Sequence, residues 1–428
     1  MRKAEEAEGA QINRIVFLTR RPISEFEEEK WGFSYLRGQN FIVEVFDLTR
    51  LLFKDTATCN SVINLVERPL EGDFIHRVGS YRELDHLLGR LADNSIFVDY
   101  VMGNLDLTLK EEKIFRLLRK HRALYTFISN GALPFPALLL RNKKKKLQAL
   151  RSKLLKAITH PRLLFSVLVS KVIVLLTRYQ IAYPLPTVIF GGDSEILQRY
   201  VNARRIEKQT IIPVNSFDYD ACILLSQGAN NRLPGYENIC VFLDEAATHH
   251  PDSAMIGVDP AAAEPYFAAM NRFFDFVEKE TGCKIVIAAH PRSNYESMPK
   301  VFGDREVIKG KTVDLVAKSK LVIMHASTSL NYAVFFRKPI VFLKIPGMKA
   351  ENQADKMVET MAFTVGNEPV DLSRDQLTPA LLQCETNLEK YAEYERRYVK
   401  TSGAGDMSVW AIVAKSVRSL RIASSNLV

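Results

Sequence analysis

Short apolar segments alternate with longer amphipathic segments along most of the chain. In the C-terminal half, three apolar runs end in polar residues: Ile239–Leu243, Lys284–Ala289 and Leu321–Met324. The amphipathic segment Ala261–Glu280 separates the first two runs, and a shorter segment after Gly310 separates the last two. This alternation predicts a β-α-β-α-β unit with parallel strands.

The N-terminal half shows the same alternation. Its predicted strands are Arg14–Leu18, Phe41–Asp47, Ser95–Tyr100, Ala123–Ser129 and Thr187–Phe190. Helical patterns such as Tyr81–Ala92 and Leu109–His121 lie between the strands. We therefore predict an α/β protein with two Rossmann-like domains that face a cleft, and with a basic amphipathic helical insertion in the first domain.

The chain of 428 residues is long enough for two domains of ordinary size. The segment Gln227–Asn238 is rich in Gly, Pro and Asn, which is typical of a linker. We place the first domain at 1–230, the second at 231–375, and a set of C-terminal helices that pack back on the first domain at 376–428.

The net charge of +9 is unevenly distributed along the chain. Between Lys113 and Gly192 there are 16 Lys and Arg and no Asp or Glu. Subtracting these 16 charges from the total leaves about −7 for the remainder of the chain. One region therefore supplies the whole basic excess.

Within that region, the segment 141–178 combines four consecutive lysines, Lys143–Lys146, with the apolar run Leu163–Thr177. The run is about 15 residues long and contains Lys171, whereas ~20 apolar residues are needed to span a bilayer. A pair of basic amphipathic helices on an anionic membrane surface fits the pattern better. A solvated basic surface is the alternative. Nucleic acid is disfavoured as a partner because no aromatic residues are interleaved with the lysines.

The cysteines and the N-terminus indicate the compartment. The five cysteines are scattered and show no metal-ligand spacing, which favours a reducing environment. The first ten residues carry acids and no apolar core, so we expect no signal peptide. The predicted location is the cytoplasm, peripheral on the inner face of the cytoplasmic membrane.

The polar strand ends supply the candidate chemistry, because parallel strands deliver them to one crevice at the carboxyl edge of the sheet. The first run ends in Asp244-Glu245, followed by the small residue Ala246. A carboxylate in this position can act as a general base toward an acceptor hydroxyl. A capped helix start with exposed acids is the alternative.

The loop that follows contains further polar residues. His249, His250 and Asp252 could form a metal site with Asp244-Glu245, but such closely spaced ligands lack the geometry of known zinc motifs. We therefore expect that no metal is required. Asp252 and Ser253 are instead candidate contacts to the acceptor or the donor.

The other two strand ends are suited to binding phosphate. His290 can donate to a phosphate oxygen, Pro291 fixes the turn, and Arg292 adds a positive charge. The cluster Ser327, Thr328 and Ser329 opens a predicted helix that runs to Phe336, and hydroxyls with free backbone amides at a helix start form an anion site. An ordinary N-cap is the alternative. Gly310 and Thr312, ahead of another helix, are candidate contacts of the same kind.

Taken in order, Asp244-Glu245, then His290-Pro291, then the Ser-Thr-Ser cluster before a helix and the strand that starts at Lys338, resemble bacterial GT-B glycosyltransferases that use CMP-activated sugars. These include bacterial sialyltransferases and the Kdo transferases of capsule assembly. The resemblance implies that Asp244 is the favoured base, with Glu245 as the other candidate. It also implies that His290 and the Ser-Thr-Ser cluster hold the CMP phosphate.

Some residues distinguish among the families that share this order of motifs, and other families remain as alternatives. Asp252-Ser253 and Gly257 bring the chain closer to the Kdo-transferase form, whereas the sialyltransferase form has a glycine where Ala246 stands. UDP-sugar 2-epimerases share the His-Pro turn but have ribose-binding glutamates after the helix start, where this chain has Leu330-Asn331-Tyr332. Glycerophosphotransferases with a CDP donor are the nearest rival, and a non-catalytic membrane-associated scaffold is a third hypothesis.

The resemblance also assigns the two domains. The nucleotide-sugar donor is expected in the second domain and the glycan or lipid-linked acceptor in the first. The transferred sugar is expected to be a 2-keto acid sugar of the Kdo or sialic-acid type, moved onto a glycan or glycolipid in bacterial polysaccharide assembly.

Overall fold

The computed structural model describes most of the chain, in these ranges: 11–64, 66, 68–101, 109–129, 134, 185–192, 194–204, 206–207, 210–227, 235–249, 261–346 and 353–420. The predicted basic segment 141–178 lies outside the described residues, as do His250, Asp252 and Ser253. In the part that is described, no helix is both long enough and apolar enough to cross a membrane.

The N-terminal half forms a seven-stranded parallel sheet. Its strands are β1 Arg14–Thr19, β2 Ile42–Asp47, β3 Ile75–Arg77, β4 Ser95–Tyr100, β5 Leu124–Ser129, β6 Val188–Gly191 and β7 Ile211–Pro213. The order is β3-β2-β1-β4-β5-β6-β7, so the direction of winding reverses between β1 and β4. This is the doubly wound order of a Rossmann fold.

The C-terminal half repeats this topology in a five-stranded parallel sheet. Its strands are β8 Ile239–Leu243, β9 Lys284–Ala289, β10 Glu306–Lys309, β11 Leu321–Met324 and β12 Ile340–Phe342. The order is β10-β9-β8-β11-β12, with the reversal between β8 and β11. The predicted fold class of two Rossmann-like α/β domains is confirmed.

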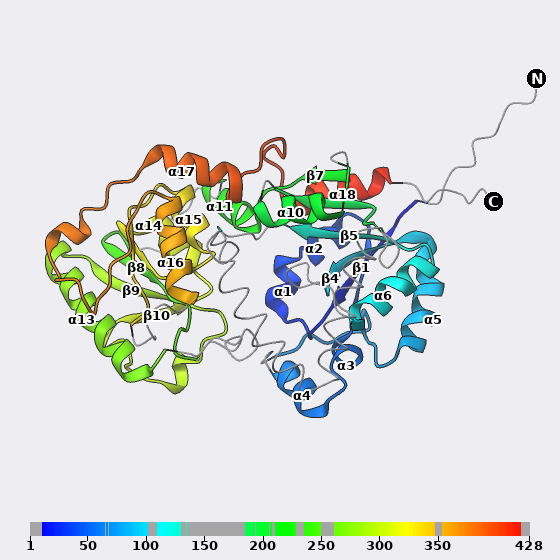
Figure 1. Ribbon diagram of the computed structural model, residues 1–428, viewed down its shortest axis with the longest axis horizontal. Helices are drawn as coiled ribbons and strands as arrows, with labels where there is room; N and C mark the ends of the chain where they lie inside the picture. The colour runs from blue at the N-terminus through cyan, green and yellow to red at the C-terminus, as the bar shows by residue number, and fades with distance from the viewer. Residues whose placement is uncertain are drawn as a thin grey trace, which may run out of the picture.

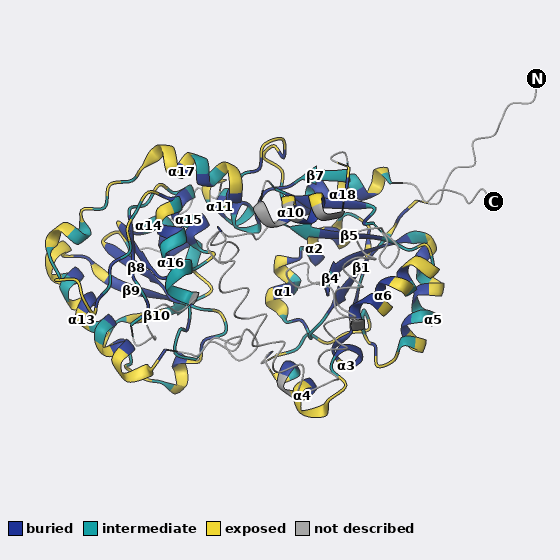
Figure 2. Ribbon diagram, in the orientation of Figure 1, coloured by how far each residue is buried: buried dark blue, intermediate teal, exposed yellow. Residues whose placement is uncertain are grey.

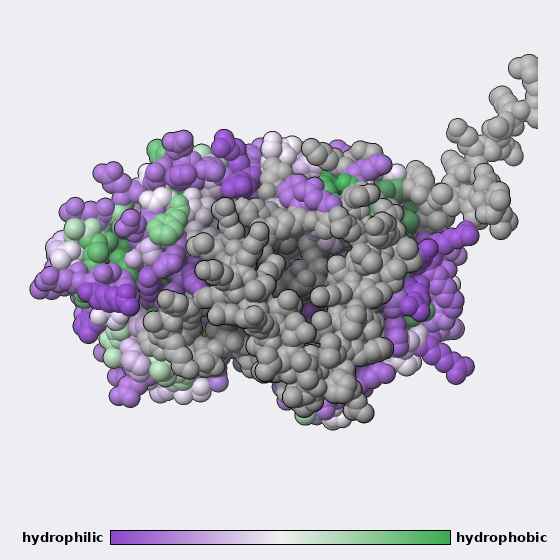
Figure 3. Space-filling view, in the orientation of Figure 1, coloured by the Kyte–Doolittle hydropathy of each residue, from purple (hydrophilic) through white to green (hydrophobic). Residues whose placement is uncertain are grey.

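Helices cover both sheets (Figure 1). In the first half they are α1 Glu25–Lys30, α2 Phe33–Gly38, α3 Thr49–Leu52, α4 Thr56–Asn64, α5 Tyr81–Leu91, α6 Leu109–Lys120 and α10 Glu195–Arg204. In the second half they are α11 Phe217–Gln227, α13 Ala263–Thr281, α14 Thr312–Lys318, α15 Leu330–Phe335, α16 Gln353–Thr364, α17 Leu388–Tyr394 and α18 Val409–Ser419. Hydrophilic residues dominate the surface over α17, α5 and α6 (Figure 3).

The central strands are buried on both faces, as parallel strands covered by helices should be (Figure 2). In β8, Val241 packs into a core with α14, α15 and α16, while Phe242 packs into the core of α13 on the opposite face. In β1, Phe17 and Leu18 divide in the same way between two cores. This two-sided burial explains why the central strands read as continuous apolar runs in the sequence.

The structure divides the chain earlier than the predicted boundary at residue 230. α11 packs against α14 and α15, and its Tyr219 belongs to the core of the second sheet. The predicted linker Gln227–Asn238 therefore follows an element of the second domain instead of joining the two domains. The chain crosses at Val214–Ser216, since Val214 still belongs to a core of the first sheet.

The predicted C-terminal helices separate between the domains. The expected helix over Gln376–Tyr398 is broken: a 3-10 turn covers Pro379–Leu382, and α17 begins only after Asn387, whose side chain caps it. Tyr391 and Tyr394 of α17 are buried in the second domain. Only α18 returns to the first domain as predicted.

α18 closes one face of the first domain. Trp410 is buried against Phe17 and Phe217, with ring centroids 5.7 and 5.9 Å away, and its indole N–H donates to the Lys30 carbonyl at 2.9 Å. Gly32, between α1 and α2, has φ 61°, and an added Cβ would lie 2.4 Å from the Trp410 ring. Glycine is required there for both its conformation and its size.

Candidate functional site

Three predicted strand ends meet at the carboxyl edge of the second sheet. Leu243, the last residue of β8, pairs with Ala288 of β9 on one side and with Met324 of β11 on the other. The polar residues that follow these strands therefore start level with one another, and neighbouring strands are about 4.8 Å apart. The reversal point between β8 and β11 is where ligands bind in sheets of this kind.

Asp244 is a buried carboxylate that links the ends of β8 and β9. Its Oδ1 accepts from the Tyr295 hydroxyl at 2.8 Å and the Ala246 amide at 3.0 Å, and its Oδ2 accepts from the His290 amide at 3.2 Å. Burial raises the pKa of the carboxyl, while these three donors lower it. Donors to both oxygens fit a residue that positions the loops around it.

Ala246 has φ 52° and is fully buried. This left-handed conformation costs a residue with a Cβ roughly 1–2 kcal/mol. A glycine would adopt it without that cost. The bond from the Ala246 amide to Asp244 holds the strained turn in place.

Glu245 points differently from its neighbour. Glu245 is partly exposed as a residue, but its carboxyl is enclosed, and Oε1 accepts a hydrogen bond from the Ala326 amide, directly after β11. Burial of the carboxyl raises the pKa of Glu245 to about 8; the charge of Asp244 adds to this rise, and the bond from the Ala326 amide opposes it. Glu245 thus bridges the reversal point between β8 and β11.

His290 follows β9 and is partly exposed. Its Nδ1 accepts from the Arg292 amide at 3.2 Å, so the neutral ring carries its proton on Nε2. A donor at Nε2 is suited to a phosphate oxygen. The turn at Pro291 and Arg292 is closed by Ser293, whose amide donates to the His290 carbonyl at 2.9 Å.

His249 connects the loop after β8 to the loop after β9. Its Nε2 accepts from the Asn294 amide at 3.3 Å, and its Nδ1 lies 2.9 Å from the Thr248 hydroxyl. Burial lowers the pKa of His249, and the nearby charge of Asp244 opposes this shift. Both ring nitrogens are occupied by these contacts, and within the described residues no three His, Cys, Asp or Glu side chains form a metal-binding group.

Ser327, Thr328 and Ser329 form the turn between β11 and α15. The Ser327 hydroxyl accepts from the Ser329 amide at 3.3 Å, and its carbonyl accepts from the Leu330 amide at 3.1 Å. The helix runs from Leu330 to Phe335. The cluster is therefore next to Ala326, the partner of Glu245, at the reversal point.

Gly310 and Thr312 are farther away. Gly310 follows the edge strand β10, with φ 73°, and Thr312 opens α14. β10 is separated from β8 by β9, which places its end about 10 Å from the end of β8. The structure therefore does not bring these two residues next to Glu245.

His325, a buried residue for which the sequence analysis proposed no role, links elements behind the site. His325 ends the third apolar run; its Nδ1 is 2.7 Å from the Leu343 carbonyl and its Nε2 is 3.1 Å from the Tyr266 hydroxyl. Burial lowers its pKa to about 4, so it is neutral. It ties β11 to α13 and to the end of β12, and its place at the end of a buried strand is the signal that could have indicated this.

Asp218 lies where the two domains approach each other. Its Oδ2 accepts from the Asn331 side chain of α15 at 2.7 Å, and the positive charge of Lys30 in α1 acts on it from the first domain. Burial nevertheless raises its pKa. Two residues earlier, the Ser216 hydroxyl caps α11 by accepting from the Tyr219 amide at 3.1 Å.

Two Rossmann-like domains in one chain, with the last helix returning to the first domain, define a GT-B-like fold. No family model matches the chain, and no curated protein matches it in sequence.

Several solved structures are similar over nearly the whole length. A calicheamicin glycosyltransferase has 13% identity and a TM-score of 0.48, covering 95% of this chain and 97% of its own. A UDP-N-acetylglucosamine 2-epimerase has 14% identity and a TM-score of 0.47, covering 95% and 96%. The UDP-GlcNAc 2-epimerase from Neisseria meningitidis bound to UDP-GlcNAc has 14% and 0.42, covering 94% and 98%. Likenesses this low do not carry over an activity.

Proposed function

We propose that this protein is a GT-B glycosyltransferase that moves a 2-keto acid sugar of the Kdo or sialic-acid type from a CMP-activated donor to a surface glycan or glycolipid. The donor binds at the carboxyl edge of the second sheet and the acceptor binds the first domain. The order of motifs described above supports the choice of CMP and of the sugar class.

One observation carries the proposal. The Glu245 carboxylate, with a pKa raised to about 8, reaches the Ala326 amide across the reversal point, beside the hydroxyl-bearing turn Ser327–Ser329. A base with a pKa near the working pH thereby lies next to donors suited to an anionic leaving group. This combination is what glycosyl transfer from a nucleotide donor needs.

The two adjacent carboxylates take different roles in this proposal. Glu245 accepts the proton of the acceptor hydroxyl, whose oxygen forms the new bond to the anomeric carbon as the bond from that carbon to the phosphate breaks. Asp244 positions the loops through its three hydrogen bonds. The resemblance implies Asp244 as the base, whereas we favour Glu245.

The phosphate of the departing CMP receives the electron pair of the broken bond. His290 donates to it through Nε2, Arg292 supplies charge, and the Ser327–Ser329 turn supplies hydroxyls. We propose no metal in this step. EDTA should leave the rate unchanged, whereas a loss of activity that a divalent cation restores would place a metal in the loop of His250 and Asp252.

The test is a donor screen. The protein is incubated with a CMP-activated 2-keto acid sugar, CDP-glycerol or UDP-GlcNAc, with and without acceptor glycans, and nucleotide release is measured. We expect CMP release from the CMP-activated sugar, and this release should increase with acceptor. CMP release from CDP-glycerol only would support glycerophosphate transfer, because that reaction also leaves CMP. Release of UDP only would contradict the CMP donor, and no release from any donor would favour a scaffold.

A further inference from the structure

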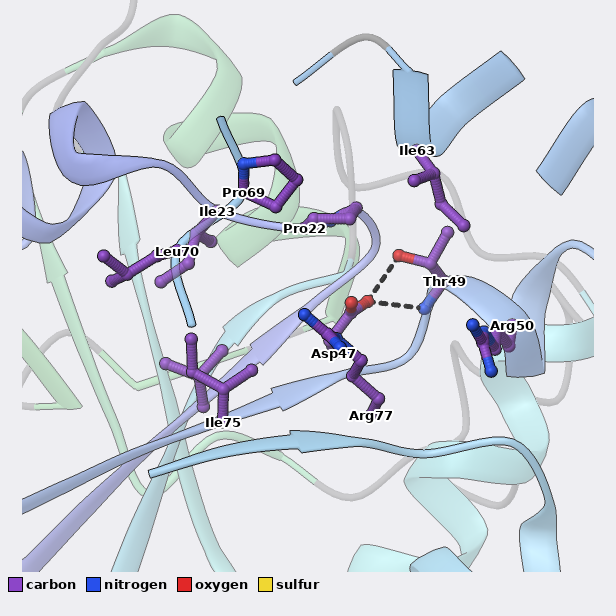
Figure 4. Close-up of a pocket in the computed structure, with 11 residues that line it drawn as sticks. Pro22, Ile23, Asp47, Thr49, Arg50, Ile63, Pro69, Leu70, Ile75 and Arg77 are labelled. Atoms are coloured by element: carbon purple, nitrogen blue, oxygen red, sulfur yellow. Dashed lines mark hydrogen bonds between the residues drawn. The ribbon is translucent and has the colours of Figure 1, made fainter. Parts of the chain in front are cut away.

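A cavity of about 230 Å³ lies at the carboxyl end of β2 and β3 in the first domain. Figure 4 shows Asp47, the last residue of β2, between the apolar and the charged side of this cavity. Pockets for drug-sized ligands start at roughly 300 Å³, so this one has room for about one ring. The cavity is at the carboxyl edge of the sheet but lies beside the reversal point between β1 and β4, so its lining residues, and not its position alone, have to indicate a ligand.

Asp47 gives the cavity a polar floor. The side chain is only 7% exposed, and its Oδ1 accepts both the Thr49 amide, at 3.0 Å, and the Thr49 hydroxyl. Among the interactions of the described residues, none uses Oδ2. Oδ2 is not among the fully buried oxygens that lack a partner, so it is open to the cavity that Asp47 lines. A ligand hydroxyl in the cavity would supply a donor.

One wall of the cavity is apolar and the opposite wall is charged. Leu70 and Ile75 form an apolar side, and Arg50 stands on the other side of Asp47 (Figure 4). Arg50 makes no ion pair or hydrogen bond within the part of the chain that the structure describes. Arg77 also lines the cavity but pairs with Glu71 at 2.9 Å. Arg50 is therefore the cation that a ligand could engage without breaking a pair.

We propose that this cavity binds a sugar ring that bears an acidic group, and that the ring is the terminal unit of the acceptor, which rests on the proposed function. A ring hydroxyl donates to Asp47, the acidic group pairs with Arg50, and the apolar face of the ring packs on Ile75. A neutral sugar leaves Arg50 unpaired, and a simple aliphatic acid leaves Asp47 without a donor. An acidic saccharide satisfies all three surfaces.

The experiment measures sugar binding by NMR titration of the full chain, without any donor nucleotide. The ligands are the methyl glycoside of a sialic acid and methyl galactoside, and the proteins are wild type, Arg50→Gln and, as a matched control, Arg82→Gln on the exposed side of α5. We expect the acidic glycoside to bind wild type about tenfold more tightly than the neutral one, the value of one charge-assisted contact. Arg50→Gln should abolish this preference, and Arg82→Gln should keep it.

The proposal is overturned if the two glycosides bind equally, if neither binds, or if Arg50→Gln retains the preference. Its failure is separate from that of the proposed function, because the donor screen is independent of it. CMP release with no preference for the acidic glycoside would support the proposed transferase activity and contradict the role of the cavity as its acceptor site. Preference without any nucleotide release would keep the acidic-sugar site and remove its role as acceptor site.

Discussion

The two adjacent carboxylates at the end of β8 have different hydrogen-bond partners: Asp244 accepts from Tyr295 and His290, and Glu245 accepts from the Ala326 amide. Asp244 and Glu245 both follow a buried strand, so pattern and spacing place both at the edge of the sheet. Which carboxylate turns inward depends on the Tyr295 hydroxyl and the His290 amide, which come from another loop. His290 and the Ser327–Ser329 turn lie at the predicted edge of the sheet. The position of Gly310 away from the reversal point could not be predicted, because the order of the strands in a sheet cannot be deduced from any single segment.

At the residue scale, Glu245→Gln should lower turnover at least ~100-fold while nucleotide affinity changes little, since general-base loss affects the transition state. In wild type, kcat/KM should rise with pH and level off above about 8, because the base works only when ionised and its pKa is about 8. The variant should lose this rise.

Asp244→Asn is the matched comparison. Its new amide group would face a backbone or hydroxyl donor, so stability should fall by about 1–3 kcal/mol. The pH profile should keep its shape with a lower midpoint, because the charge of Asp244 contributes to the raised pKa of Glu245. A pH profile of Glu245→Gln that matches wild type, together with full activity, would return the base to Asp244. Folding also raises the Glu245 pKa from its ordinary 4.5, so this group stabilises the fold at low pH, and its contribution declines as pH rises from 4.5 towards 8.

At the element scale, the buried strands were predictable from their continuous apolar runs, including the short strands β6, β11 and β12, whereas the partly exposed ones were not. β3, β7 and β10 are partly exposed, and each is only three or four residues long. Such segments carry neither a continuous apolar run nor a clear alternation. The broken helix before α17 was missed although Pro379 and Asn387 are both boundary residues, because helical spacing continues across them.

The next prediction concerns α18, the helix that joins the end of the chain to the first domain. Trp410→Ala should destabilise the protein by about 3–5 kcal/mol, since it empties a buried aromatic site. Trp410→Phe keeps a ring and loses only the bond to the Lys30 carbonyl, which should cost about 1 kcal/mol. Urea denaturation measures both. A loss below 1 kcal/mol for Trp410→Ala would mean that α18 is not an integral part of the first domain.

At the scale of the whole molecule, the chain passes between the two domains twice, first at Val214–Ser216 and again after α17. Neither crossing is in the segment Gln227–Asn238, whose composition predicted a linker. The Ser216 amide donates to the Val399 carbonyl at 2.9 Å, and the Asn215 side chain donates to the Gly405 carbonyl at 3.0 Å. The two crossings thus run side by side. Gly, Pro and Asn mark a loop in the sequence, but only packing shows to which core the preceding helix belongs.

The basic segment gives a third prediction. Each lysine near an anionic surface contributes about 1 kcal/mol at most. Replacing Lys143–Lys146 with Gln should therefore release the protein from anionic vesicles at physiological salt and spare activity on a soluble acceptor. The control changes four exposed lysines of the second domain to Gln: Lys279, Lys284, Lys300 and Lys390. Sedimentation with vesicles measures both, and equal loss in the two variants would reduce the effect to net charge.

The most direct test of the central claim, a CMP site at the carboxyl edge of the second sheet, is calorimetric titration of CMP and UDP into wild type and His290→Ala. Binding to the native state also raises the melting temperature, which provides a second readout. The account predicts that CMP binds wild type more tightly than UDP and that His290→Ala weakens CMP about tenfold or more, by removing a charge-assisted contact. Tighter binding of UDP, or CMP binding that His290→Ala leaves unchanged, would contradict it.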